Sequence, residues 1–250
     1  MNKLSTETLN KIKKLKDIIN NSNNIVAFTG AGVSTESGLK DFRSSDGLYN
    51  IKNKYHYSAE YLLSTDCFNI NPTLFYDFYK NTFNCLKAEP NITHKYLKTL
   101  EDQQKLKAII TQNIDGLHTK AGSKTVYEIH GTILKNHCPK CHKEYNADYI
   151  FNHKNIPLCS CGNIIKPDVV LYGDMLPEDA LNNGIKAIIN AETLIVLGTS
   201  LTVEPASSLV RLFKGKNLII LNKDKTQYDK YATLVINEKL STIIKELKDN

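Results

Sequence analysis

The chain has 250 residues, 41% of them hydrophobic and 23% charged, which is an ordinary globular mixture with room for one large domain and a small insert. Its net charge of +6 is spread along the chain, which argues against a specific nucleic-acid-binding patch. Because no run approaches the ~18 apolar residues of a membrane helix and no apolar leader opens the chain, we expect a cytoplasmic protein without membrane attachment.

The predicted elements alternate between helix and strand. An amphipathic helix comes first, with Ser5 and Thr6 as possible caps, and residues 25–28 form a short apolar strand. Further buried strands are predicted at 106–110, 126–129, 169–172, 194–197, 218–221 and 234–236, with helices at 93–101, 178–190 and 240–247. Since most of these strands are continuous apolar runs, the pattern favours an α/β fold with a doubly wound, Rossmann-like parallel sheet.

Two segments interrupt this alternation. Residues 45–87 are rich in Tyr and Phe, and residues 132–165 carry four cysteines. We therefore predict a helical insert and a zinc-binding insert that pack together as a small domain. The predicted Rossmann-like domain then consists of residues 1–44, 88–131 and 166–250.

Four of the six cysteines lie in two close pairs, namely Cys138 with Cys141 and Cys159 with Cys161. Without a secretory leader, paired cysteines are more typical of a metal site than of disulfides. Four thiolates suit one tetrahedral zinc ion in a structural role. Because a single residue separates the second pair, His137 and His142 remain alternative ligands.

A glycine turn follows the first predicted strand. Gly30 and Gly32 would let the backbone approach a pyrophosphate, although a tight strand–helix turn is the alternative interpretation. Thr35 occupies the third glycine position of the dinucleotide fingerprint, and no acidic residue ends a second strand ~20 residues later. These departures disfavour a hydride-transferring dehydrogenase.

Polar residues follow two further predicted strands. Gln112, Asn113 and Asp115 come directly after one strand, and His130 ends the next. Because the carboxyl ends of parallel strands form the ligand crevice, we expect these side chains to share one site. An imidazole with an unperturbed pKa of ~6.5 suits proton transfer near neutral pH.

Several segments resemble the signature motifs of the sirtuin family and occur in the family's order. They are residues 30–43 (GAGVSTESGLKDFR), 111–118 (TQNIDGLH), His130-Gly131, 166–174 (KPDVVLYGD), 198–206 (GTSLTVEPA) and Leu221-Asn222. The resemblance therefore covers nearly the whole chain.

This resemblance implies an NAD-dependent protein-lysine deacylase that consumes NAD and yields nicotinamide, O-acyl-ADP-ribose and free lysine. It assigns His130 as general base on a ribose hydroxyl, and places Asn113, Ile114 and Asp115 around the nicotinamide. It also implies one structural zinc ion held by the four cysteines. The expected partners are acyl-lysine proteins or peptides, with neither membrane nor specific nucleic acid, and we expect a monomer.

The resemblance also assigns the remaining contacts. On the diphosphate side it places Ala31, Thr35 and Arg43, and it also assigns Gly30, Gly32 and Asp41 to cofactor binding. Phe42 would cover the nicotinamide pocket and Gln112 would hold the nicotinamide ribose. Around the adenosine half it places Thr199, Ser200, Asn222, Lys239 and Leu240, and Gly198 opens the ribose and phosphate loop. Val170, Tyr172 and Gly173 would pair with the substrate backbone as an added strand.

Two features of the chain bear on selectivity. Lys40 stands where the family usually has proline, which predicts a less ordered cofactor loop. Sirtuins that remove succinyl or malonyl groups carry a Tyr-x-x-Arg pair, whereas here Tyr79 is followed by Thr82. We therefore predict uncharged acyl groups, acetyl or longer.

Three alternatives remain at this point. A mono-ADP-ribosyltransferase on the same scaffold would also use NAD, a zinc-ribbon binding module would have no activity, and a Rossmann dehydrogenase would reduce the nicotinamide. The presence of Asn113 and His130 favours deacylation over ADP-ribosyl transfer.

Overall fold

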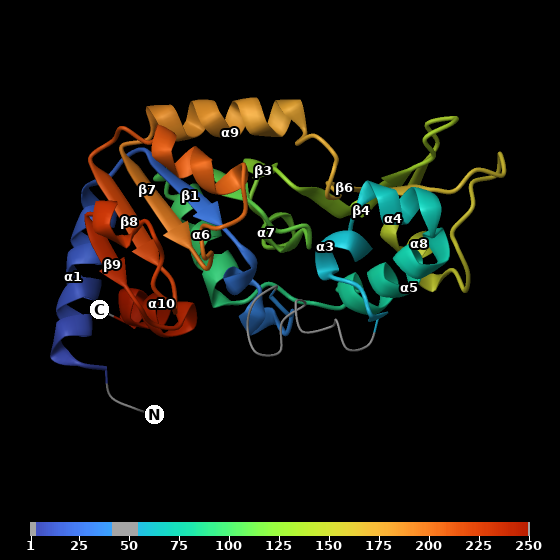
Figure 1. Ribbon diagram of the computed structural model, residues 1–250. Helices are drawn as coiled ribbons and strands as arrows, with labels where there is room; N and C mark the ends of the chain where they lie inside the picture. Colours follow the sequence, from blue (N-terminus) through green and yellow to red (C-terminus); the bar gives the residue numbers. More distant parts are fainter. Residues whose placement is uncertain (1–3, 42–54, 250) are drawn as a thin grey trace.

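The computed structural model of the protein describes residues 4–41 and 55–249 (Figure 1). Its main sheet has six parallel strands in the order β3-β2-β1-β7-β8-β9. These are β1 (Ile25–Thr29), β2 (Leu106–Thr111), β3 (Val126–Glu128), β7 (Thr193–Leu197), β8 (Asn217–Leu221) and β9 (Leu234–Ile236). The strand order reverses between β1 and β7, which is where open α/β sheets bind ligands.

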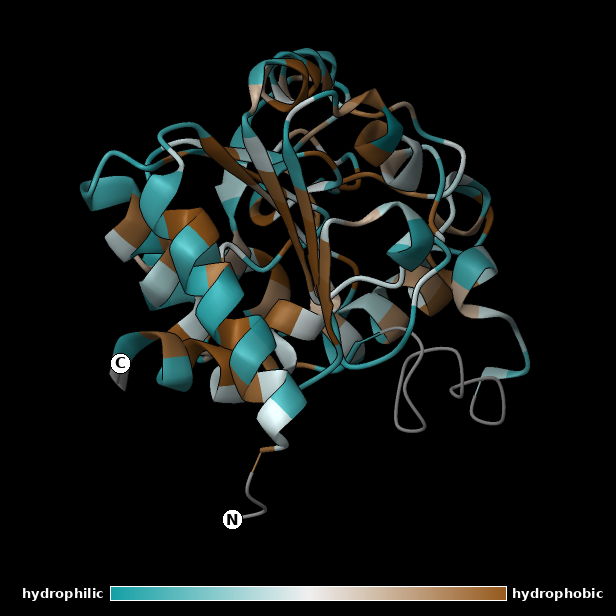
Figure 2. Cartoon of the chain, turned by 90° about the vertical axis from the view of Figure 1, so that its left-hand side faces the viewer, coloured by the Kyte–Doolittle hydropathy of each residue, from teal (hydrophilic) through white to brown (hydrophobic). Residues whose placement is uncertain are grey.

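Helices cover both faces of this sheet, so the predicted doubly wound fold is confirmed. On one face lie α1 (Thr6–Asn21), α6 (Ile92–Asp102) and α10 (Leu240–Asp249); on the other lie α9 (Glu178–Asn190) and the 3₁₀ helix η4 (Ala206–Leu212). Side chains of β1 alternate between the two cores: Ala27 faces α1, and Phe28 faces the α9 side. Figure 2 shows the hydrophobic strands running between the two helical layers.

The residues that begin and end α1 show how the local sequence determines the bounds of a helix. The Ser5 hydroxyl accepts the Thr8 N–H at 3.1 Å and begins α1. Leu15 is completely buried against the sheet. At the other end the Lys105 ammonium donates to the Ile19 carbonyl at 3.1 Å and to a second carbonyl at 2.7 Å, which stabilises the unpaired groups of the last turn.

A smaller lobe contains the two inserts and lies beyond the carboxyl ends of the main strands (Figure 1). Its helices are α3 (Ala59–Leu62), α4 (Thr65–Ile70), α5 (Pro72–Phe83) and α8 (Ala147–Asn152). A three-stranded antiparallel sheet of β5 (Glu144–Asn146), β4 (Gly131–His137) and β6 (Lys166–Val169) completes it. These elements share a separate hydrophobic core.

One strand prediction is wrong. Residues 169–172 do not form a strand of the parallel sheet, because β6 ends at Val169 and pairs antiparallel with β4. Val169 and Leu171 are buried in the core of the small lobe instead. A short apolar run predicts that a segment is buried, but it does not say in which of the two hydrophobic cores. The prediction for this segment failed for that reason. The domain boundaries themselves stay a prediction.

No helix in the described part of the chain is both long and apolar enough to cross a membrane.

Candidate active site

Two loops that follow adjacent strands touch each other through glycines. The Gly32 N–H donates to the Gly198 carbonyl at 2.8 Å, joining the turn after β1 to the turn after β7. A Cβ on Gly30 would lie 2.6 Å from the Thr199 Cβ, and one on Gly198 would lie 2.5 Å from the Val33 nitrogen. Gly198 also has φ +60°, in the left-handed region. These glycines therefore permit close backbone approach at the switch point of the sheet.

A hydrogen-bonded group lies next to these loops. The Asn113 side-chain amide donates to the Ser34 hydroxyl at 3.0 Å, and this hydroxyl donates to Asp115 Oδ2 at 2.7 Å. The Leu117 N–H donates to Asp115 Oδ1 at 2.8 Å. Both oxygens of the carboxylate are thus held in place, and the amide of Asn113 is fixed beside it. Burial raises the pKa of Asp115, although the two hydrogen bonds oppose the shift.

His130 is oriented by the strand next to its own. Its Nδ1 lies 3.0 Å from the Gln112 carbonyl oxygen. Because a carbonyl can only accept, Nδ1 carries the proton and Nε2 of the neutral ring keeps a free lone pair. Burial lowers the pKa of His130, and the bond to the carbonyl opposes that shift. The ring is therefore held as a neutral base at neutral pH.

Other predicted cofactor residues lie around the same loops. The Gln112 side chain donates to the Thr199 hydroxyl at 3.1 Å, and the Thr35 hydroxyl donates to the Gly32 carbonyl at 3.0 Å. Ala31 lies in the 3₁₀ helix η1 (Ala31–Val33), while Thr35 begins η2 (Thr35–Ser37). Their roles toward NAD stay predictions.

The residues predicted around adenosine are more dispersed. The Asn222 side chain follows β8 and donates to the Asp224 carbonyl at 2.8 Å. Ser200 lies 2.9 Å from the Thr202 hydroxyl, and Lys239 is exposed. Leu240 is different, because its side chain is 5% exposed and lies in the main core. Only its backbone could contact a nucleotide.

Two of the predicted cofactor residues, Phe42 and Arg43, lie outside the described residues. Asp41 and Lys40 are the last residues before that gap.

The predicted substrate strand is partly engaged within the protein. The Tyr172 N–H donates to the Leu63 carbonyl at 2.9 Å, and its carbonyl accepts the Thr65 N–H at 3.0 Å. Tyr172 therefore pairs with the small lobe through both of its backbone groups. The Val170 N–H also donates to the His130 carbonyl at 2.9 Å, so the Val170 carbonyl and Gly173 stay the candidates for pairing with a peptide backbone.

Two residues near the site were missed by the sequence analysis. Ser34 links Asn113 to Asp115, and its position after the glycine turn did not single it out, because Ser37 shares that position. Glu128 is the last residue of β3, two residues before His130, and it interacts with the charge of Asp115. Burial, together with the nearby charge of Asp115, raises the pKa of Glu128 to about 7.

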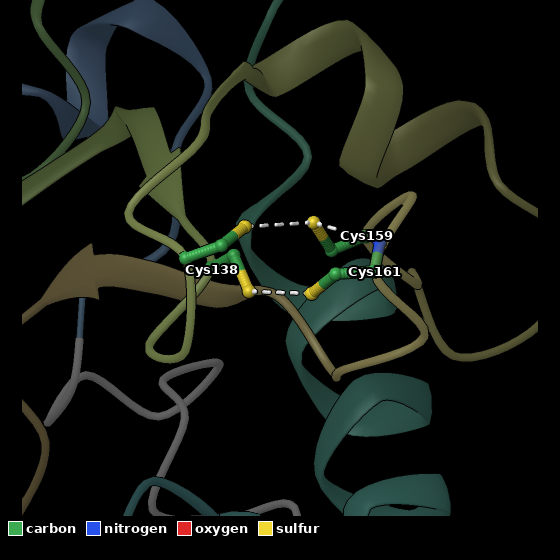
Figure 3. Close-up of side chains that lie close together, drawn as sticks. Cys138, Cys159 and Cys161 are labelled. Atoms are coloured by element: carbon green, nitrogen blue, oxygen red, sulfur yellow. Dashed lines mark hydrogen bonds between the residues drawn. The ribbon is translucent and has the colours of Figure 1, made fainter.

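The four cysteines predicted to bind a metal do lie together in the structure. The sulfurs of Cys138, Cys141, Cys159 and Cys161 all lie within 4.8 Å of one another, with Cys138 3.5 Å from Cys161 and Cys141 3.4 Å from Cys159 (Figure 3). Zn–S bonds of ~2.3 Å in a tetrahedron place sulfurs at about these separations. His137 contacts the Asp168 carboxylate instead, so the four sulfurs form the ligand set that fits zinc.

Tyr79, the tyrosine compared with the Tyr-x-x-Arg pair, lies in the core of the small lobe. Its side chain is completely buried and its ring stacks on Phe75 and Phe151, each at 5.6 Å between centroids. The prediction of uncharged acyl groups, which rests on Thr82 in place of an arginine, stays a prediction.

Comparison with known proteins supports this description. A family model described as the Sir2 family matches residues 30–205. The chain is 49% identical over 241 residues to an NAD-dependent protein deacetylase of Clostridium perfringens, covering 96% of this chain and 99% of that relative.

Two solved structures are also similar. A Sir2 structure with a deacetylated p53 peptide and 3′-O-acetyl ADP-ribose has a TM-score of 0.88 and 37% identity, covering 95% of this chain and 97% of the other. A Sir2 structure with a p53 peptide and NAD⁺ has a TM-score of 0.82 and 38% identity, covering 95% and 96%.

Proposed function

The chain belongs to the Sir2 family, and we propose that it acts as an NAD-dependent protein-lysine deacetylase. The products are nicotinamide, O-acetyl-ADP-ribose and the free lysine. NAD is consumed as a co-substrate, and an acetyl-lysine protein or peptide is the second substrate.

One observation supports this proposal above the others. A neutral imidazole with a free Nε2, a fixed amide and a fixed carboxylate follow the neighbouring strands β2 and β3 at the carboxyl edge of the sheet, and Ser34 ties the amide and the carboxylate to the loop after β1. A binding module has no need of a base held in one tautomer, and a dehydrogenase transfers hydride without one on the ribose.

Each group has a distinct task in this proposal. Bound NAD supplies the nicotinamide–ribose bond that breaks and the ribose hydroxyl that takes the acyl group. Positive charge develops on the ribose as nicotinamide leaves, and the Asp115 carboxylate is held close enough to the pocket to stabilise that charge. The Asn113 amide, fixed by Ser34, orients the nicotinamide side.

His130 acts in the later step. Before it, the acyl carbonyl oxygen bonds to the ribose carbon that nicotinamide leaves. His130 Nε2 then takes the proton from the ribose hydroxyl, which attacks the acyl carbon. Water enters as the lysine amine departs, so the acyl group ends on the ADP-ribose. The Gln112 carbonyl keeps the proton on Nδ1 and stabilises the imidazolium that forms. Phe42 and Arg43 keep their predicted roles over the nicotinamide and beside the diphosphate.

The zinc site is structural in this account. All four ligand positions are filled by cysteine sulfurs, so a bound zinc ion has no open position for a substrate. Its contribution is to join the loop after β4 to the segment before β6.

Mass spectrometry of the products tests the function. NAD and an acetyl-lysine peptide should give nicotinamide, O-acetyl-ADP-ribose and deacetylated peptide in equal amounts. A peptide that gains ADP-ribose while keeping its acetyl group would identify a mono-ADP-ribosyltransferase instead.

The acyl preference rests on charge. The resemblance gives succinyl- and malonyl-removing sirtuins a Tyr-x-x-Arg pair, whose guanidinium can bind a carboxylate bidentately. Here Thr82 takes the place of that arginine, and the chain's two arginines, Arg43 and Arg211, lie outside both predicted inserts. We therefore expect acetyl peptides to react faster than succinyl peptides of the same sequence. Faster turnover of succinyl-lysine would contradict this.

A further inference from the structure

A second cavity lies away from the strand tips. It has a volume of about 730 Å³ and is bordered by the end of η4, the beginning of β8 and the segment 227–233. Leu218 lines it near the first residue of β8, whereas the catalytic residues follow the carboxyl ends of their strands. The cavity therefore opens toward the opposite edge of the sheet. Its volume falls within the ~300–1,000 Å³ of small-molecule sites.

The charges around this cavity have one sign. Arg211, Lys216 and Lys230 line it, and no Asp or Glu does. None of the three forms an ion pair with a carboxylate of residues 4–41 or 55–249. Glu204 is near enough to interact with Arg211 but does not line the cavity. Three cations around one concave surface, none of them in an ion pair, raise the local concentration of anions.

Two tyrosines hold the side chains of Arg211 and Lys230 in place beside the cavity. The rings of Tyr228 and Tyr231 lie 6.4 Å apart between centroids. The Arg211 Nε donates to the Tyr228 hydroxyl at 2.9 Å, and the guanidinium lies 5.8 Å from that ring. Lys230 Nζ lies 4.9 Å from the Tyr231 ring centroid. The terminal nitrogens of Arg211 can therefore face a ligand while the rest of the guanidinium is held.

The cavity also offers a surface for a planar group. Tyr228 is buried, and its hydroxyl donates to the Ser207 carbonyl at 3.2 Å, whereas Tyr231 is 66% exposed. An exposed aromatic ring beside a phosphate-binding guanidinium suits a nucleobase, because every base presents a flat face for stacking.

We propose that this cavity binds a nucleotide, with Arg211, Lys216 and Lys230 on its phosphates and Tyr231 against its base. The site is separate from the NAD cleft. The concave shape and the volume favour a small phosphorylated ligand over an acidic protein surface.

The absence of tryptophan allows a local test. Tyr231→Trp places a single tryptophan at the cavity of the full-length protein. We expect saturable quenching of its fluorescence by ADP, weaker binding of pyrophosphate, and little response to adenosine. Tyr149→Trp, on the small lobe, is the matched control and should not respond.

The charge variants complete the test. Adding Arg211→Gln and Lys230→Gln to the Tyr231→Trp protein should weaken ADP binding roughly tenfold or more, while deacetylation of an acetyl peptide stays unchanged. Quenching that is absent up to millimolar ADP, or that survives both substitutions, would overturn the proposal. Equal affinity for ADP and pyrophosphate would contradict the role of the ring.

Discussion

At the scale of single residues, the site depends on small polar links between groups far apart in sequence. Ser34 joins Asn113 and Asp115, which lie 79 and 81 residues away along the chain. The charged residues could be chosen from the sequence because of their strand-tip positions. The hydroxyl between them could not, because nothing in a linear pattern says which of the several serines near the glycine turn faces the carboxylate.

The hydrogen bonds through Ser34 predict that removing its hydroxyl lowers the rate of deacetylation. Ser34→Ala leaves the Asp115 carboxylate and the Asn113 amide without their shared hydroxyl, so we expect kcat for deacetylation to fall roughly 10- to 100-fold. Ser208→Ala removes an exposed hydroxyl that bonds to Glu204 and should leave kcat unchanged. Equal rates for both variants in steady-state assays would show that the link has no catalytic role.

The burial of His130 predicts the pH profile. A general base must be neutral, and burial lowers the pKa of His130 below its usual 6.5. Single-turnover acyl transfer should therefore remain above half its maximum at pH 6.5 and decline only in more acidic buffer. Glu128→Gln is the control. It removes the carboxyl with a pKa of about 7, whose titration could otherwise be mistaken for that of His130. An apparent pKa above 7 in both proteins would contradict this assignment.

At the scale of elements, continuous apolar runs predicted the main strands well because each is covered on both faces. Residues 234–236 and 178–190 match β9 and α9 at both ends. The same rule failed at 169–172, where the apolar residues belong to the small lobe. Pairing partners and lobe membership arise from tertiary contacts, so periodicity alone could not assign them.

The contact between the turns after β1 and β7 can be tested at Gly198. Gly198→Ala adds a Cβ at positive φ and within 2.5 Å of a backbone nitrogen, so it should cost about 1–3 kcal/mol and raise KM for NAD. Gly162→Ala has a similar φ of +84° but meets nothing within 4 Å. It should lower stability by ~1 kcal/mol and leave KM unchanged. Matching KM values for NAD in the two variants would contradict a role for this contact.

At the scale of the whole molecule, two buried histidines tie stability to pH. The rings of His94 and His118 lie 4.8 Å apart, and His118 Nε2 lies 3.0 Å from the Thr29 hydroxyl at the end of β1. Burial lowers the pKa of His94 to about 4 and that of His118 to about 3, with His94 adding to the second shift. Both rings are therefore neutral when folded, whereas they protonate near 6.5 when unfolded.

This arrangement predicts acid sensitivity. Below pH 6.5 the unfolded chain binds protons that the folded protein does not, so stability falls from pH 6.5 downward. The loss levels off near pH 4 for His94 and near pH 3 for His118, where each buried ring itself becomes protonated. Urea unfolding at pH 7 and pH 5 should differ by about 2 kcal/mol for each histidine. His118→Gln should reduce this difference, and the exposed His56→Asn should not. If the unfolding free energy of His118→Gln and of His56→Asn changed by the same amount between pH 7 and pH 5, the buried histidines would not be the cause.

The most direct test of the central claim is the single-turnover rate of deacetylation by His130→Asn, measured with saturating NAD and acetyl-lysine peptide. Without the base, the rate should fall at least ~100-fold while NAD binding, followed by calorimetry, stays within a few-fold of wild type. A rate within threefold of wild type in a folded, NAD-binding variant would contradict the assignment of His130 as the base and of this sheet edge as the active site.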